Sequence, residues 1–382
     1  MKICTWGNVA SALEGKTAGG GELQIALLAK ALAKGGHEVA VVDIMVKNDF
    51  VTDDGVKVFQ VKGYDDGIRA IRFFTNRLPK IYASLKAQKA DVYYCQIRDF
   101  RHLLAYWAAK KNNGIFVLQL ASDLDASTLR MKFKYGYLTH FGGLFWFLKI
   151  FLNELIFPWL LRKADMVLVQ HEGQKAILQK KGIKSIIFNN LIELNEVPEI
   201  SDPVRQDFSY VGSLDKRKGF AQFFELAGKA PSATFKVIGQ PRDRTAFKYY
   251  EKLKQFNNVH LLGRLNHCDT MCQIANSKAL VSTSPMEGFP NIFIEAWACG
   301  IPVLSLYFDP GGVIKREQLG EVAEGNLDKL INFMVFNKNT SEFSKKSKAY
   351  VELNHVLNDN KIYEISCLFS DLFNNRESKI AL

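Results

Sequence analysis

The stretch EGFPNIFIEAWACGIPV, residues 287–303, is the part of this 382-residue chain that decides its fold class. An apolar run at residues 279–283 precedes it and is typical of a buried parallel strand that ends in a turn. Pro290 suits a helix start and Gly300-Ile301-Pro302 suits a helix end, so a helix is predicted over about residues 290–299. Strand, loop and helix in this order are one unit of an α/β sheet.

The beginning of this helix is predicted to bind a phosphate. Its first turn has unpaired N–H groups around Phe289 and Asn291, flanked by Gly288 and Pro290, and the helix dipole favours an anion there. Glu295, about one turn further on, suits a vicinal diol such as ribose, and Glu287 on the loop suits a sugar hydroxyl. Most glutamates are solvated surface charges. Glu295, however, lies among apolar residues and would need a hydrogen-bonding partner.

Two series of apolar runs alternate with helical stretches, which predicts two doubly wound parallel sheets. The runs are at residues 2–5, 39–43, 92–95, 115–120 and 167–170, then at 208–212, 234–238, 259–261, 280–283 and 303–306. The polar stretch 195–206 between the two series is the expected linker. Ligands of such sheets bind beyond the carboxyl ends of the strands, so we expect a site in a cleft between two facing domains.

These motifs resemble the retaining glycosyltransferases of family 4, whose E-x7-E signature corresponds to Glu287 and Glu295. Other stretches resemble the family in the same order: GGGELQIALLAKALAKGGHEVAVV from Gly19, LRKADMVLVQHEGQKAIL, IIFNNLIE, YVGSLDKRKGF and VHLLGRL. The resemblance covers nearly the whole chain. It implies the GT-B fold of two Rossmann-like domains: an acceptor-side domain of residues 1–195 with a crossover helix at 361–382, and a donor-binding domain of residues 196–360.

The resemblance also implies which groups bind the diphosphate. A departing nucleoside diphosphate gains negative charge, and Lys218 stands where the family has its diphosphate lysine. The family usually has a second cation at the position of Ser213, so either Arg217 replaces it or Ser213 donates a neutral hydrogen bond. The glycines Gly19, Gly20 and Gly21 would allow a close backbone approach to phosphate or sugar. Without the resemblance, the KRK run also fits a solvated turn and the glycine run a flexible loop.

Asp123 is the candidate for contacting sugar or acceptor hydroxyls, because Ser122 and Asp123 occupy the place where family members often have histidine. The family's mechanism implies no covalent nucleophile. The D-x-D pattern at Asp123 and Asp125 is also how the GT-A fold holds a divalent metal, but that fold has no counterpart of the C-terminal motifs. Cys268 and Cys272 beside His267 lack a second ligand pair at zinc spacing. We therefore expect no metal and no cofactor beyond the donor.

The composition indicates a globular protein with an anionic partner. The net charge is +11, and residues 130–164 combine basic and aromatic side chains in a segment that fits either a membrane interface or an amphipathic core helix. Lys149, Glu154 and Pro158 argue against a membrane span. Six scattered cysteines and the start MKICTWGN, which reads as a strand rather than a signal peptide, predict reduced thiols and a cytoplasmic location. No nucleic-acid-binding module is evident.

Together these features predict a metal-independent retaining hexosyltransferase. The donor would be a nucleotide-diphosphate sugar, in our interpretation UDP-linked, and the acceptor a glycan or lipid-linked oligosaccharide of a surface polysaccharide such as capsule or lipopolysaccharide. It would act in the cytoplasm or on the inner face of the cytoplasmic membrane. The alternatives are an NAD-dependent oxidoreductase, a nucleotide-sugar epimerase of the same fold, and a non-catalytic binder of anionic glycans. The oxidoreductase lacks a G-x-G-x-x-G loop directly after a strand.

Overall fold

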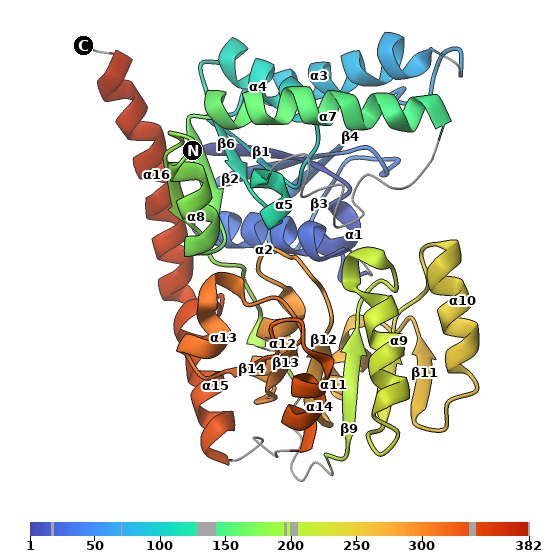
Figure 1. The fold of residues 1–382 in the computed structure, drawn as a ribbon. Helices are drawn as coiled ribbons and strands as arrows, with labels where there is room; N and C mark the ends of the chain where they lie inside the picture. The colour runs from blue at the N-terminus through green and yellow to red at the C-terminus, as the bar shows by residue number, and fades with distance from the viewer. Residues whose placement is uncertain are drawn as a thin grey trace. The chain divides into compact units, whose positions relative to one another are not determined.

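The computed structural model describes residues 1–16, 19–69, 71–127, 143–194, 197–198, 205–335 and 341–380 (Figure 1). The chain forms two compact units. The first consists of Met1–Ala121, Phe141–Leu191 and Leu357–Leu382, and the second of Ser122–His140 and Ile192–Val356. Each unit has its own sheet, so each has its own hydrophobic core.

The first unit is built on an eight-stranded sheet of order β3-β4-β2-β1-β5-β6-β7-β8. The strands are β1 Lys2–Gly7, β2 Glu38–Asp43, β3 Phe50–Val51, β4 Lys57–Gln60, β5 Val92–Gln96, β6 Ile115–Gln119, β7 Met166–Val169 and β8 Ser185–Ile187. All pairs are parallel except the short edge strand β3, which runs antiparallel to β4. Strands β5 and β6 are buried along their whole length, as expected for a parallel sheet covered on both faces.

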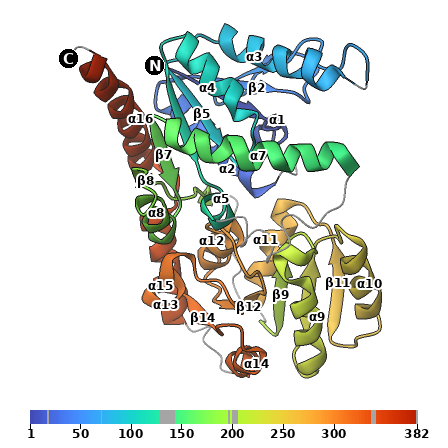
Figure 2. The same cartoon turned by 45° about the horizontal axis from the view of Figure 1, so that its top comes forward.

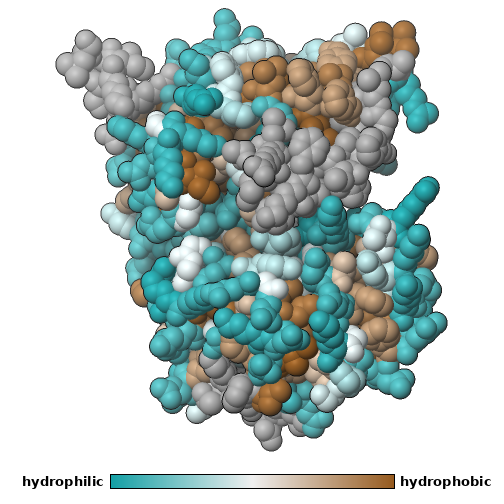
Figure 3. Space-filling model, viewed as in Figure 1, coloured by the Kyte–Doolittle hydropathy of each residue, from teal (hydrophilic) through white to brown (hydrophobic). Residues whose placement is uncertain are grey.

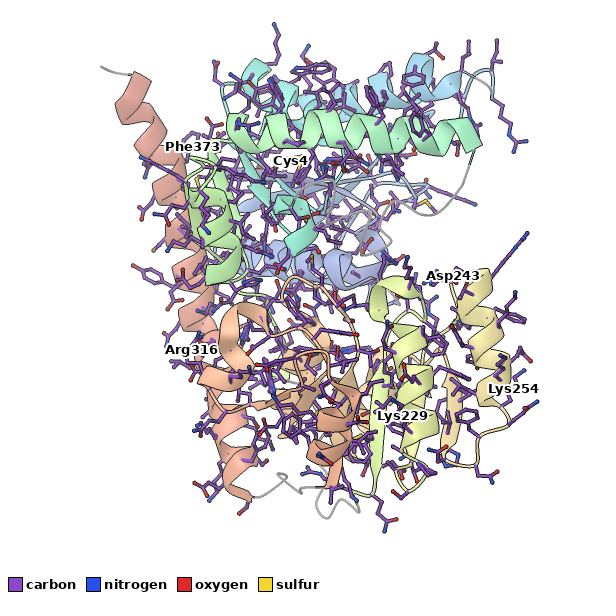
Figure 4. All side chains as sticks on the ribbon, viewed as in Figure 1. Cys4, Lys229, Asp243, Lys254, Arg316 and Phe373 are labelled. Atoms are coloured by element: carbon purple, nitrogen blue, oxygen red, sulfur yellow. The ribbon has the colours of Figure 1, made fainter. Side chains whose placement is uncertain are left out.

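Helices cover both faces of this sheet (Figures 1 and 2). They are α1 Ala10–Leu13, α2 Gly20–Lys34, α3 Leu78–Ala87, α4 His102–Lys111, α7 Gly143–Lys163, α8 Glu172–Gln179 and α16 Asp359–Ile380, and a π-helical turn, Phe73–Arg77, precedes α3. Helix α16 contributes the buried Ile365 and Phe369 to the core that β1, β2 and α2 form, and Phe373, labelled in Figure 4, packs against the same core. The last helix of the chain is therefore part of the first unit.

The second unit is built on a six-stranded parallel sheet of order β11-β10-β9-β12-β13-β14. The strands are β9 Asp207–Val211, β10 Phe235–Ile238, β11 Val259–Gly263, β12 Ser277–Ser282, β13 Val303–Ser305 and β14 Gly320–Val322. The helices are α5 Asp123–Ala126, α9 Phe220–Lys229, α10 Arg244–Leu253, α11 His267–Ala275, α12 Asn291–Ala298, α13 Val313–Arg316, α14 Leu327–Val335 and α15 Ser341–Asn354. One core lies under α9, α10 and α14, and another under α11, α12 and α15.

The predicted fold class, two α/β units with parallel sheets, is confirmed. Strands β3, β4, β8 and β14 were not predicted; three of them have three residues or fewer, too short for a clear pattern. Helix α12 begins at Asn291, with Pro290 just before it in extended conformation, and ends at Ala298. It is thus slightly shorter at both ends than predicted. Most of the expected linker 195–206 lies outside the described residues, and the domain boundaries stay predictions.

Candidate functional site

In the second unit, two distant residues meet at the carboxyl ends of adjacent strands. Strand β12 pairs with β9, so the loops that follow these strands are neighbours. Lys218 follows β9 and Glu287 follows β12, and the Lys218 Nζ lies 2.6 Å from the Glu287 Oε1. The lysine side chain is 32% exposed and the glutamate side chain 18%. The structure therefore brings together a cation and a carboxylate that the sequence separately predicted for the site.

Hydrogen bonds to both backbone groups of Lys218, its N–H and its carbonyl, fix the loop after β9. The buried carboxylate of Asp215 accepts hydrogen bonds from the N–H groups of Arg217 (2.9 Å) and Lys218 (3.1 Å) and so caps the 3₁₀ turn Lys216–Lys218. The Lys218 carbonyl accepts hydrogen bonds from the hydroxyls of Tyr210 (2.9 Å) and Thr283 (3.0 Å). Burial raises the pKa of the Tyr210 hydroxyl, which keeps it a neutral donor. The position of Lys218 is thus fixed by its backbone.

Gly219 is required by this loop for a steric reason. Its φ of 68° lies in the left-handed region, and a Cβ at this position would stand 2.0 Å from the carbonyl oxygen of Thr283. The close approach lets the turn after β9 pack directly on the end of β12. The glycine after Lys218 therefore sets the distance between the two strands that carry Lys218 and Glu287.

Arg217 and Ser213, the two candidates for a second phosphate contact, are placed differently. The Arg217 Nη2 lies 2.7 Å from the Asp215 Oδ2, so the Arg217 guanidinium forms an ion pair with the residue that caps its own turn. Ser213 is half-buried between β9 and this turn. Their roles in binding a diphosphate stay predictions.

Glu295 lies on α12 and is buried, with an exposed fraction of 8%. Its Oε1 is 3.3 Å from the Nε2 of His267, the first residue of α11. A buried carboxylate needs such a partner. In the sequence, His267 stands beside Cys268 and Cys272, which lack the second ligand pair of a zinc site. The signal that could have identified it is its position. His267 follows the carboxyl end of β11, and Lys218 and Glu287 follow the carboxyl ends of β9 and β12 in the same parallel sheet.

The residues that lead into α12 have a clear packing role. Gly288, Phe289 and Pro290 are buried, and Asn291 is half-buried. The ring of Phe289 lies 5.0 Å from the ring of His355 and 6.2 Å from that of Trp297. These contacts fix the start of the helix. Binding of a phosphate by its backbone N–H groups stays a prediction.

Asp123 joins this site through its backbone. It is the first residue of α5, within the second unit by its contacts, and its N–H donates to the carbonyl of Glu287 at 2.9 Å. Asp125, the other half of the D-x-D pattern, is buried and accepts a hydrogen bond from the Ser122 N–H at 3.0 Å as part of a capping box. Among the residues that the structure describes, no group of three or more His, Cys, Asp or Glu is placed to hold a metal ion.

The glycine run that was predicted to approach phosphate or sugar starts α2 in the first unit. Gly19 precedes the helix and Gly20 is its first residue. A Cβ at Gly21 would lie 2.5 Å from the Cδ1 of Ile97, so this glycine is needed for packing within the unit. An approach of these glycines to a ligand stays a prediction.

A cavity of about 640 Å³ lies next to Gly19, at the carboxyl ends of β1 and β2. Its lining is rich in polar side chains, among them Asn8, Glu14, Glu22, Asp43, Lys47 and Asn48. The carboxylate of Asp43 also accepts backbone hydrogen bonds from Ala10 (2.8 Å) and Met45 (2.7 Å), which hold the loops around the cavity. Such a lining suits a hydroxyl-rich ligand.

Ile97, directly after β5, is a strained residue at the same edge of the first sheet. Its φ is 71°, a conformation that a β-branched residue rarely adopts. The Ile97 carbonyl lies 2.6 Å from the Nε2 of the buried His102, whose Nδ1 accepts a hydrogen bond from the Trp6 Nε1 at 3.1 Å. The acceptor role of Nδ1 requires that Nε2 carries the proton. Sequence reasoning missed Ile97, since no residue type signals strain of this kind.

Comparison with known proteins agrees with this geometry. Residues 198–335 match the family model "Glycosyl transferases group 1". The matched part contains Lys218, Glu287 and Glu295 and lies within the second unit. An uncharacterized glycosyltransferase of Methanocaldococcus jannaschii is 26% identical over 171 residues, which cover 40% of this chain and 42% of that protein. The chain thus spans less than half of the length of this relative.

Solved structures of glycosyltransferases share the fold over nearly the whole chain. Sucrose-phosphate synthase from Thermosynechococcus elongatus matches with a TM-score of 0.74 at 16% identity, over 98% of this chain and 100% of that one. HepE of Anabaena, solved in complex with UDP, matches with a TM-score of 0.66 at 14% identity over 98% and 100% of the two chains. The lipopolysaccharide outer core galactosyltransferase WaaB matches with a TM-score of 0.62 at 21% identity, again over 98% and 100%. The fold is GT-B, as the sequence predicted.

Proposed function

We propose that the protein is a retaining glycosyltransferase of the family 4 type, which uses a nucleotide-diphosphate sugar as donor. The observation that carries the proposal is the ion pair of Lys218 and Glu287 at the carboxyl ends of β9 and β12, with the buried Glu295 on the helix that follows. In the reaction, an acceptor hydroxyl oxygen forms a bond to the anomeric carbon on the face from which the diphosphate departs. The anomeric C–O bond to the diphosphate breaks, and a diphosphate oxygen takes the proton of the acceptor.

Each residue has a role that its chemistry supports. The Lys218 ammonium has three donors, one of them directed at Glu287, and meets the charge that grows on the leaving diphosphate. The Glu287 carboxylate orients Lys218 and accepts a hydrogen bond from a donor sugar hydroxyl. Glu295 accepts hydrogen bonds from the ribose diol, while His267 holds its Oε1. The N–H groups of Gly288, Phe289 and Asn291, on either side of Pro290, face the phosphates at the start of α12. Asp123 contacts sugar or acceptor hydroxyls.

The donor in this proposal is a UDP-sugar that transfers a hexose or a derivative of one. A protein of the same fold has been solved with UDP, and this supports the choice of base. Binding of the diphosphate by Lys218 and helix N–H groups requires no metal. The proposal therefore includes metal-independent transfer.

The acceptor in this proposal is a glycan or a lipid-linked oligosaccharide of a surface polysaccharide. The cavity of about 640 Å³ in the first unit offers carboxylates, amides and one lysine to its hydroxyls. A galactosyltransferase of the lipopolysaccharide core shares the fold, which supports this acceptor class, and the net charge of +11 suits an anionic glycan or membrane. We place the reaction in the cytoplasm or at the inner face of the cytoplasmic membrane.

The first test is the thermal stability of the purified full chain with UDP, GDP, ADP or NAD, each with and without EDTA. A ligand at about 100 times its Kd adds roughly 2.7 kcal/mol to the free energy of unfolding of the unit that binds it. We expect stabilisation by UDP that survives EDTA and is weakened in Glu295→Ala. Stabilisation by NAD alone would assign the protein to the oxidoreductases. Stabilisation by UDP without transfer to any glycan would leave a non-catalytic binder.

A further inference from the structure

Helix α7 of the first unit exposes an apolar row along its length. Phe147, Phe151, Leu155 and Trp159 follow one another at intervals of four residues, so they lie on one side of the helix. Their exposed fractions are 66%, 54%, 61% and 39%. Large apolar residues are usually exposed singly on a soluble protein. A continuous row of four is a surface that favours removal from water.

The opposite side of α7 is firmly attached to the first unit. Phe157, Leu160 and Leu161 are buried there. The Asn153 Oδ1 accepts a hydrogen bond from the Phe100 N–H at 2.6 Å, and the Glu154 Oε1 lies 2.9 Å from the Arg98 Nη2. The side toward the unit is thus already packed. The exposed row is therefore not a core face that a small rotation of the helix would bury.

Neighbouring elements extend the apolar surface. Trp159 packs edge-on against Tyr106 of α4 at 5.2 Å, and Trp107, the next residue of α4, is 47% exposed. Ile68, Ile71 and Phe74, before α3, are also exposed, and α3 packs against α4. Figure 3 shows brown side chains over the region where Figure 1 draws α7 and α3. Several elements of the first unit thus contribute to one apolar face.

The exposed charges of α7 have one sign. Lys149, Arg162 and Lys163 of α7 are exposed, whereas Glu154, the one acidic residue of α7, is engaged by Arg98. An apolar row flanked by cations complements a membrane with anionic lipids: the acyl region takes up the apolar side chains and the headgroups attract the cations. A second protein copy would bring the same three cations against each other.

We propose that the exposed face of α7 is a lipid-binding surface, through which the first unit binds the surface of a membrane that contains anionic phospholipids. The helix lies parallel to the membrane, with Phe147, Phe151, Leu155 and Trp159 in the interface and Lys149, Arg162 and Lys163 at the headgroups. Within the described part of the chain, every helix is too short or too polar to span a bilayer. This inference does not rest on the proposed enzymatic function.

The test is sedimentation of the full chain with vesicles of phosphatidylcholine mixed with phosphatidylglycerol, and with vesicles of phosphatidylcholine alone. We expect binding to the anionic vesicles that weakens at high salt. In F151Q/L155Q the partition into vesicles should fall by about tenfold or more, since two large apolar side chains lose their insertion. Lys149→Gln combined with Arg162→Gln should lower binding to the anionic vesicles and leave binding to the phosphatidylcholine vesicles unchanged.

Matched controls come from the second unit. Phe247 of α10 is 55% exposed, and Phe247→Gln should leave binding unchanged. Lys229 and Lys254, labelled in Figure 4, are exposed cations, and their replacement by Gln should have little effect. All these side chains are exposed, so the melting temperatures should stay near the wild-type value. Equal binding of wild type and F151Q/L155Q would overturn the proposal. A dimer that forms without vesicles and is lost in F151Q/L155Q would show that a second copy covers this face instead.

Discussion

The carboxyl edges of the two sheets differ in the kind of chemistry they present. In the second unit a cation, Lys218, and a carboxylate, Glu287, are in direct contact, and a third ionisable group, Glu295, is buried on the helix that follows Glu287. In the first unit the same edge holds a cavity whose described lining has Lys47 among the acids Glu14, Glu22 and Asp43. An anionic diphosphate suits the former edge, and a neutral hydroxyl-rich molecule suits the latter. Two similar sheets thus present different chemistry at their carboxyl ends.

The glycines at the two edges differ as well. Gly219 in the second unit has a left-handed backbone and faces a carbonyl oxygen, which cannot move without moving β12. Gly19 in the first unit has an ordinary φ of −77°, and its nearest neighbour is the flexible end of the Glu22 side chain. The loop after β9 in the second unit is therefore fixed by its backbone, whereas at Gly19 in the first unit only the end of a side chain would have to move.

The largest effect is expected from removal of the Lys218 ammonium. Lys218→Met should lower the rate of glycosyl transfer by about 100- to 1000-fold, because a preorganised cation at a developing negative charge contributes about 3–4 kcal/mol to the transition state. Lys216→Met, an exposed lysine of the same turn, is the matched control and should stay within about threefold of wild type. Initial rates with a saturating donor measure both. Equal rates for the two variants would show that Lys218 does not act in the reaction. The proposed difference between the carboxyl ends of the two sheets would then be wrong.

The second prediction compares the two glycines. Gly219→Ala should lower the free energy of unfolding by about 3 kcal/mol or more, since its Cβ would lie 2.0 Å from the Thr283 oxygen. Gly19→Ala should lower the free energy of unfolding by less than about 1 kcal/mol. The added Cβ would meet the Glu22 carboxylate, which can rotate away. Calorimetric unfolding of the two variants measures the difference. Similar losses would show that both loops are equally rigid.

The same contrast explains how much could be predicted from sequence. The site of the second unit rests on local patterns: a strand, a loop that carries Glu287, and a helix that carries Glu295, with seven residues between the two glutamates. The meeting of Lys218 with Glu287, 69 residues apart, was expected only through the family resemblance. The contact of His267 with Glu295 joins residues 28 positions apart on two helices, and no local pattern predicts it. In the first unit, the cavity is formed by short loops and Ile97 is strained by its surroundings, and neither property has a pattern in the sequence.

The third prediction concerns binding of the nucleotide. Glu295→Gln keeps the shape of the side chain but removes its charge, so the Kd for UDP should rise by about tenfold, within the range for hydrogen bonds to charged groups. His267→Ala should raise the Kd for UDP by a smaller factor. In the double variant the Kd should rise by less than the product of the two single factors, because both substitutions act on one contact. Isothermal titration calorimetry gives all four Kd values. Independent effects would mean that His267 does not position Glu295.

The last prediction concerns the pH dependence of the first unit. Burial lowers the pKa of His102, and its neutral ring accepts from Trp6 and donates to Ile97. Below about pH 6.5 the unfolded chain takes up a proton that the folded one does not, so stability falls as the pH falls, by at most about 1.4 kcal/mol per pH unit. His102→Gln keeps one donor and one acceptor but cannot titrate.

Asp99 and Arg101 are the charged groups that act on His102, with opposite effects on its pKa, and both remain in this variant. Urea unfolding of the two proteins between neutral and mildly acidic pH should therefore differ in slope by up to one proton. Parallel curves would show that His102 takes up a proton in the folded unit as readily as in the unfolded chain. A protonated Nδ1 would then face the Trp6 N–H, and that hydrogen bond would be lost.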